Sequence, residues 1–243
     1  FRREKPTNVG KNIGVDNHEV VIEALDPTVG MRAAAKASQL GLPISIDSCE
    51  LIKNQELPNP WPREVREDLV AFIGGGSAME RVWEALDQAG VIEKWLPEWS
   101  SVRSLPQRNA LHRHTVDRHM VETAICAANL TRTVHRPDLL LVGSLFHDIG
   151  KPKTRSIRKG KGVTFHHHEV VGARMTRERL KALKYSTEDV EAIKKAGDEL
   201  ATAAQKIGEA MYKKQQNDAS TVGGAPGTDP EPPKPEEPGN PSV

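Results

Sequence analysis

The stretch that decides the fold is Gly143-Ser144-Leu145-Phe146-His147-Asp148-Ile149-Gly150-Lys151. It closes an apolar segment of helical character, places an imidazole beside a carboxylate, and then breaks at a glycine. Burying two ionisable side chains at the end of an apolar helix is costly unless their charge is compensated. A divalent metal is the obvious compensator, because imidazole and carboxylate both ligate such ions. The stretch therefore predicts a buried helix that ends at a metal site.

Two further histidine-bearing segments flank this stretch. His119 lies upstream, on a segment with helical periodicity, and the run Phe165-His166-His167-His168-Glu169 lies downstream. A lone His-Asp pair is more often an ordinary hydrogen-bonded pair than a metal site. Here three separate segments of the chain carry histidine or aspartate, and together they can surround a metal ion.

This arrangement resembles the HD superfamily of metal-dependent phosphohydrolases. Residues 106–119, with 83–90 and 96–99, look like the HD region of the bifunctional uridylyltransferase/uridylyl-removing enzymes (GlnD), so that resemblance covers roughly residues 10–150. Residues 147–186 look more like the HD region of bacterial poly(A) polymerase/tRNA nucleotidyltransferase relatives. Residues 188–243 resemble the C-terminal end of DnaK-type chaperones. The chain thus looks like a mosaic of three sources.

The resemblance implies a set of site residues. The metal ligands would be His119, His147, Asp148 and His168, holding a divalent ion such as Mg, Mn, Fe or Zn, with Asp148 bridging two ions if the site is binuclear. Asp148 would also be catalytic. Lys151 would offset substrate phosphate charge, although a solvated loop lysine is an equally ordinary interpretation.

Other histidines and acids have weaker claims. His112 and His114 precede the His119 helix or lie off its face, and His166 and His167 flank the ligand. His18 and His135 carry no signal. HD enzymes complete their metal shell with a later Asp, for which the only candidates here are Asp189 and Asp198, and both come too early in the chain. We therefore expect weakened metal binding.

The periodicity predicts an all-α fold, an HD-type helical bundle with a helical N-terminal extension, a C-terminal helix and a disordered tail. The only strand-like run is Val20-Val21-Ile22, inside an irregular arm of residues 1–24, and residues 152–162 form a basic loop. The predicted helices span residues 29–40, 47–53, 64–72, 79–89, 116–130, 137–147, 170–183 and 190–216.

Five regions follow from these elements. They are an N-terminal arm with short helices (1–62), a helical lead-in (63–110), the HD metal-binding core (111–186), an amphipathic helix (187–216) and a disordered tail (217–243).

Composition narrows the functional classes. The net charge of the 243 residues is +1, so no global field attracts nucleic acid. No apolar run reaches the length of a membrane span, and residues 1–20 lack a signal-peptide core, so we expect a soluble cytoplasmic protein. The two cysteines, Cys49 and Cys126, show no metal-ligand spacing. A start at Phe1 suggests a fragment.

Three functions remain open. The first is metal-dependent phosphodiester hydrolysis of the uridylyl-removing type, acting on a nucleotidylated PII-type signal protein in nitrogen regulation. The second is an HD phosphohydrolase for nucleotides or tRNA ends, favoured by the basic run Lys151–Lys161, with RNA as a weaker partner. The third is a catalytically inactive helical binding module. No Gly-Ser followed by an Asp-x-Asp pair occurs, so no transferase activity is expected.

Overall fold

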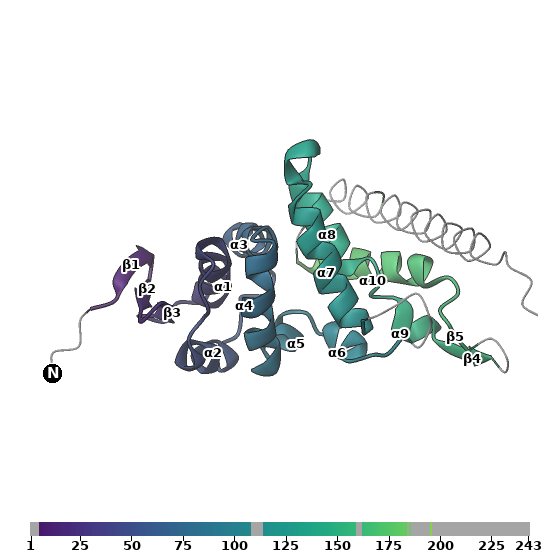
Figure 1. Ribbon diagram of the computed structural model, residues 1–243, viewed down its shortest axis with the longest axis horizontal. Coiled ribbons are helices and arrows are strands. Elements are labelled where there is room, and N and C mark those ends of the chain that lie inside the picture. Colours follow the sequence, from purple (N-terminus) through teal and green to yellow (C-terminus); the bar gives the residue numbers. More distant parts are fainter. Residues whose placement is uncertain (1–4, 108–113, 159–161, 184, 186–194, 196–243) are drawn as a thin grey trace, which may run out of the picture. The chain divides into compact units, whose positions relative to one another are not determined.

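The computed structural model describes residues 5–107, 114–158, 162–183, 185 and 195 (Figure 1). In chain order the strands and helices are β1 (Thr7–Gly10), β2 (Ile13–Asp16), β3 (Glu19–Ile22), α1 (Val29–Leu40), α2 (Ile46–Lys53), α3 (Arg63–Ile73), α4 (Ser77–Gln88), α5 (Val91–Trp95), α6 (Trp99–Val102), α7 (Val116–Ala128), the 3₁₀ turn η1 (Thr131–Thr133), α8 (Pro137–Phe146), α9 (Lys151–Thr154), β4 (Ser156–Arg158), β5 (Gly162–Thr164) and α10 (His168–Ala182). The described part is helix-rich, as the periodicity predicts.

The all-α prediction is wrong for two small antiparallel sheets. The expected irregular arm is a three-stranded meander in the order β1-β2-β3, with Ile13 paired to Ile22 and Asp16 to Glu19. The two residues between β2 and β3, Asn17 and His18, both have positive φ, at 48° and 63°. Such two-residue turns normally carry glycine, so the Asn-His pair hides the hairpin from sequence patterns.

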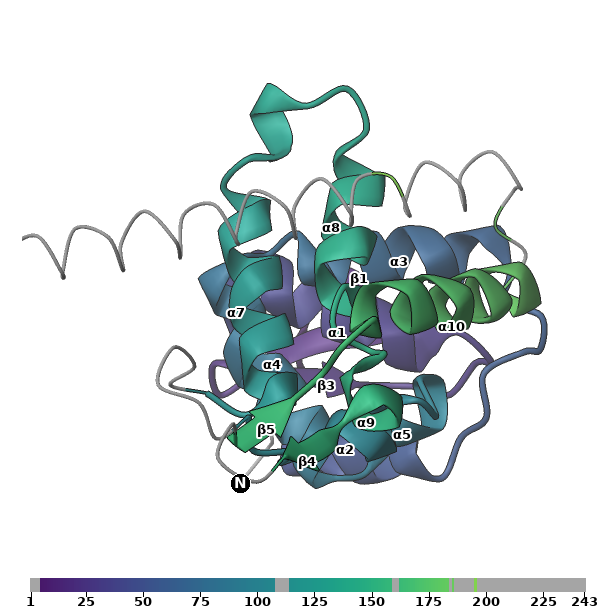
Figure 2. The same ribbon diagram turned by 90° about the vertical axis from the view of Figure 1, so that its right-hand side faces the viewer.

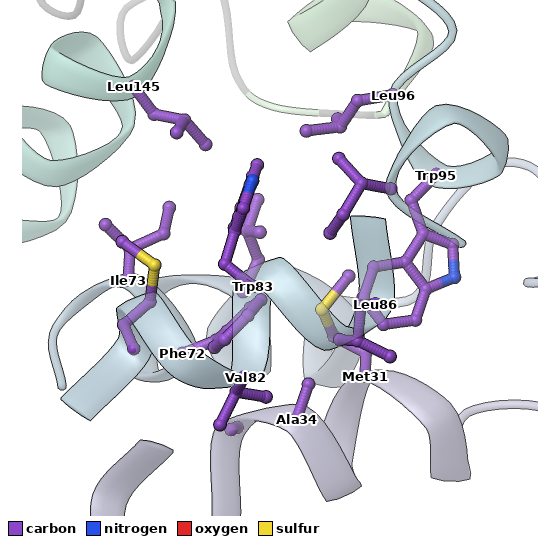
Figure 3. Packing of buried hydrophobic residues seen from close by; sticks show 14 of the residues in the cluster. Met31, Ala34, Phe72, Ile73, Val82, Trp83, Leu86, Trp95, Leu96 and Leu145 are labelled. Atoms are coloured by element: carbon purple, nitrogen blue, oxygen red, sulfur yellow. The ribbon is translucent and has the colours of Figure 1, made fainter. Parts of the chain in front are cut away.

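The first helices pack around small and aromatic side chains. Alanines on α1 let α3 approach closely, and Ser38 donates a buried 2.8 Å hydrogen bond to the Phe72 carbonyl oxygen. Phe72 stacks on Trp83, whose ring meets Trp99 edge to face at 4.9 Å between centroids. Figure 3 shows Phe72 and Trp83 among the buried side chains, with Leu145 of α8 above them. This core supports the site-bearing helices.

Helices α7 and α8 lie against each other and hold the central part of the site. α8 is almost wholly apolar and buries seven of its ten residues, as the sequence predicts for residues 137–147. Arg118 of α7 forms ion pairs with Glu80 and Glu84 of α4. These pairs fix the face of α7 next to His119.

In its described residues, the predicted basic loop at 152–162 has mostly regular secondary structure instead. Its first residues form the short helix α9, and β4 and β5 form a hairpin that connects α9 to α10 (Figure 2). Arg179 of α10 makes a bidentate ion pair at 2.8–3.0 Å with Glu98, which lies just before α6. Arg66 of α3 donates a hydrogen bond to the carbonyl oxygen of Leu183, the residue that follows α10.

Several expectations concern residues outside this description. The disordered tail at 217–243 falls there, as does the amphipathic helix at 187–216 apart from Lys195, and the five-region division stays a prediction. Among the described helices, none combines the length and apolar character that a membrane span requires.

Candidate metal centre

The end of α8 carries the central pair of the site. His147 caps the helix, and its Nδ1 lies 2.8 Å from the Ser144 carbonyl oxygen one turn earlier. A carbonyl accepts only, so Nδ1 donates this hydrogen bond, which turns Nε2 towards the site. Nε2 lies 3.2 Å from Asp148 Oδ2. The helix end thus orients both side chains towards one point.

His119 reaches the same point from α7. Its Nε2 lies 3.3 Å from His147 Nε2 and 3.5 Å from Asp148 Oδ2. One ligand atom from each of His119, His147 and Asp148 lies within 4.8 Å of the other two. Two imidazole nitrogens and a carboxylate oxygen that converge in this way form the donor set that a divalent transition metal prefers.

His168 approaches the other side of the carboxylate. Its Nε2 lies 3.3 Å from Asp148 Oδ1, and its Nδ1 is held 2.7 Å from the Phe165 carbonyl oxygen. His119 and His147 therefore face one oxygen of Asp148, and His168 faces the other. The three histidines expected as ligands therefore all approach the fourth expected ligand, Asp148.

Asp148 is ionised in this setting. Its side chain is only 4% exposed, and burial alone would raise its pKa. The charge and hydrogen bond of His147, the hydrogen bond with His168 and the charge of Lys151 outweigh burial and hold the pKa well below its ordinary value. The hydrogen bond with Asp148 also raises the pKa of His168, against the effect of burial.

Lys151 lies inside the site rather than in a solvated loop. It begins α9, its side chain is 6% exposed, and its Nζ donates a 2.7 Å bond to Asp148 Oδ2. Nζ also lies 2.6 Å from Oε1 of Gln107, a residue 2% exposed. No local sequence pattern singles out Gln107, because 44 positions separate it from Lys151.

A close backbone contact brings α10 to the site. A methyl group at Gly150 would overlap the His168 carbonyl oxygen and the backbone of Gly172. A methyl group at Gly172 would lie 3.2 Å from the Gly150 nitrogen. Two facing glycines therefore let the turn after Asp148 touch the first turns of α10, which places His168 opposite Asp148.

The remaining candidates are not brought into the described site. His114 is exposed and precedes α7, and His166 and His167 are exposed beside His168. His18 lies in the β2–β3 turn, and His135 is exposed before α8. His112, Asp189 and Asp198 lie outside the described residues.

Comparisons with known proteins find a family match that covers the clustered residues. Residues 116–222 match the family described as HD domain. The chain is 52% identical over 128 residues to a bifunctional uridylyltransferase/uridylyl-removing enzyme of Streptomyces coelicolor, covering 52% of the chain and 15% of the relative. A Mycobacterium tuberculosis protein of the same description is 40% identical over 172 residues, covering 70% of the chain and 20% of the relative.

A relative of another description also matches. The A-adding tRNA nucleotidyltransferase of Deinococcus radiodurans is 34% identical over 143 residues, covering 57% of the chain and 31% of that protein. The resemblance of residues 188–243 to a DnaK-type chaperone receives no support, and the HD match itself extends through residue 222.

The chain spans a fifth or less of the length of the uridylyltransferase/uridylyl-removing relatives described above. The match includes the histidines and the aspartate of the cluster, because residues 116–222 contain all four. Residues 116–222 therefore match an HD domain, and the chain is similar to part of the bifunctional uridylyltransferase/uridylyl-removing enzymes and of an A-adding tRNA nucleotidyltransferase.

Proposed function

We propose that the chain is a metal-dependent phosphohydrolase that removes a nucleotidyl group from a PII-type signal protein by phosphodiester hydrolysis. The convergence of His119, His147 and His168 on Asp148 carries the proposal. Similarity to uridylyl-removing enzymes supports the substrate class. A divalent cation in such a ligand set lowers the pKa of bound water and polarises a phosphoryl oxygen.

The protein itself orients the side chains around Asp148 and limits the access of solvent to them. Asp148 offers one oxygen to His119 and His147 and the other to His168, so both oxygens face donor nitrogens. His147 is 9% exposed, whereas His119 and His168 are 33% and 30% exposed. The site therefore opens between His119 and His168, and the substrate phosphate enters from that side.

The direct test is release of UMP from a uridylylated PII-type protein with added Mn²⁺, followed by chromatography. The double variant His147→Ala, Asp148→Ala should lose activity by about a hundredfold or more, because it removes two of the proposed ligands. His135→Ala, at an exposed position before α8, is the matched control and should retain full activity. Equal activity of the double variant would refute the assignment.

A second candidate function is hydrolysis of nucleotides or tRNA ends. The run from Ile149 to His168 contains no acidic residue and six lysines or arginines, and Lys153 and Arg155 are exposed beside the site. The tRNA nucleotidyltransferase relative agrees with such a substrate. Hydrolysis of 2′,3′-cyclic nucleotides or tRNA 3′ ends, with no UMP release from the PII-type protein, would favour it.

The third candidate is an inactive binding module. The absence of a family-like final Asp among the sequence candidates favours it. Such a module would bind a uridylylated PII-type protein more tightly than the unmodified one and would hydrolyse none of these substrates. Calorimetric titration with both forms of the partner separates this case from the two enzymes.

A further inference from the structure

The Lys151 ammonium is enclosed by protein groups on several sides. Asp148 Oδ2 and Gln107 Oε1 lie 2.7 Å and 2.6 Å from Nζ, and the face of Phe165 lies 5.7 Å from it. The side chain is 6% exposed. An ammonium with this burial and these acceptors points inwards, away from an incoming phosphate.

Gln107 is built to hold that ammonium. Its Nε2 donates a 3.2 Å bond to the His114 carbonyl oxygen, and this bond directs the amide oxygen towards Lys151. The amide is buried, so both of its ends are satisfied by protein. Gln107 also links Lys151 to the segment that leads into α7, the helix that carries His119.

The position of this ammonium decides how much of Asp148 a metal can use. His119, His147 and Lys151 all face Oδ2 of the same carboxylate. An ammonium that kept Asp148 as its only acceptor would compete with a cation for that oxygen. Gln107 Oε1 is a second acceptor, which shares the hydrogen bonding of the Lys151 ammonium with Asp148 and fixes the position of the ammonium.

We propose that Gln107 is a positioning residue of the metal centre, which anchors Lys151 beside Asp148 and so keeps Oδ2 available to a metal. The inference rests on the proposed function in taking the cluster as a metal centre. It assigns Lys151 to the support of a ligand, in place of the substrate contact that the sequence suggests.

The experiment is calorimetric titration of the metal-free chain with Mn²⁺. Gln107→Met keeps the length of the side chain but removes its oxygen, and it should lower Mn²⁺ affinity by about tenfold. Gln107→Glu keeps an oxygen opposite Lys151 and should restore most of that loss. Gln55→Met is the matched control, because Gln55 is half-buried and donates to the Asp26 carbonyl oxygen; it should leave affinity unchanged.

A second arm tests whether Gln107 acts through Lys151. In a Lys151→Met background, adding Gln107→Met should produce no further loss of affinity, since the ammonium is gone. Unchanged affinity in Gln107→Met, equal losses in Gln107→Met and Gln107→Glu, or an undiminished loss in the Lys151→Met background would each overturn the inference.

These readouts separate the inference from the proposed function. A chain that binds Mn²⁺ with the expected pattern but releases no UMP refutes the proposed hydrolysis and leaves the role of Gln107 standing. If the chain binds Mn²⁺ and releases UMP but its Mn²⁺ affinity is unchanged in the Gln107 variants, the role of Gln107 is refuted and the proposed hydrolysis stands. A chain that binds no divalent metal refutes both.

Discussion

Asp148 is the residue on which the other site groups depend. Three imidazoles and one ammonium face its two oxygens, and its side chain is 4% exposed. A buried carboxylate remains ionised only where such partners replace water. Lys151 in turn depends on this carboxylate, because its ammonium is nearly as buried and needs a negative charge beside it.

Asp148→Asn should therefore destabilise the protein as well as remove metal binding. Losing the charge leaves the buried Lys151 ammonium uncompensated, and we expect about 3 kcal/mol of lost unfolding free energy. Urea denaturation of the metal-free chain measures it. Asp138→Asn is the control, because its ion pair with Arg136 is exposed and should be worth about 0.5 kcal/mol. Equal effects of the two variants would contradict this account.

At this scale the sequence indicated which side chains cluster at the candidate site better than it indicated the groups that support them. His147 and Asp148 are adjacent, and His119 and His168 belong to recognisable motifs, so the expected set could be named. The enclosure of Lys151 was not foreseen, because it depends on Gln107 and Phe165, which reach the lysine only through the tertiary fold.

At the scale of elements, the Gly150–Gly172 contact sets the distance between α10 and the end of α8. Gly150→Ala should displace α10, because the new methyl group meets backbone atoms that cannot rotate away. We expect a destabilisation of about 2–3 kcal/mol and a loss of Mn²⁺ affinity. Gly172→Ala, which is less crowded, should do less.

Chemical denaturation and Mn²⁺ titration together check this expectation. Gly10→Ala is a suitable control, since its nearest neighbour would be the Lys36 side chain at 3.9 Å. If Gly150→Ala behaved like Gly10→Ala, the close approach would not be what positions His168.

The N-terminal sheet is joined to α1 through Asp26. This carboxylate, 15% exposed, accepts two 3.0 Å bonds from Arg32, bonds from both Thr28 donors and a 2.8 Å bond from Asn12. The hydrogen bonds with Arg32, opposed by burial and aided by those with Thr28, hold the pKa of Asp26 well below its ordinary value.

This shift gives a pH dependence with a definite sign. The pKa is lower in the folded chain, so the stabilisation is complete above about pH 4, the pKa of an unfolded Asp, and is lost as the pH falls below it. Asp26→Asn should cost about 1–2 kcal/mol at pH 7 and progressively less towards pH 2. Denaturation curves at several pH values test this, and a cost that does not change with pH would contradict it.

The longer described helices were predicted closely, whereas the short helices α5, α6 and α9 and the strands were not. Apolar periodicity and breaking glycines placed α1 and α8 almost to the residue. The β1–β3 meander escaped because its strands have four residues each and one turn uses Asn17-His18 in place of glycine. The β4–β5 hairpin escaped because its strands have only three residues each, too few to show an alternation of apolar and polar residues.

At the scale of the whole molecule, the region that carries the proposed chemistry ends before the polar tail. Truncation after Gln216 should leave Mn²⁺ affinity and solubility within about twofold of the full chain, because the clustered residues from His119 to His168 all precede the cut. Titration and sedimentation of both forms provide the measurement. A truncated chain that precipitates or loses metal would place a necessary residue in the tail.

The end of α8 has one more consequence for this centre. A helix finishes with carbonyl oxygens that lack intrahelical partners, and its C-terminal end carries partial negative charge. In α8 the Ser144 carbonyl oxygen is hydrogen-bonded to the His147 ring. Fraying of the last turn of α8 would therefore also change the orientation of the His147 ring. A cation bound there is attracted by the partial negative charge at the C-terminal end of α8, and it in turn stabilises the last turn of that helix. Amide hydrogen exchange in the final turn of α8 should accordingly become slower when Mn²⁺ is added.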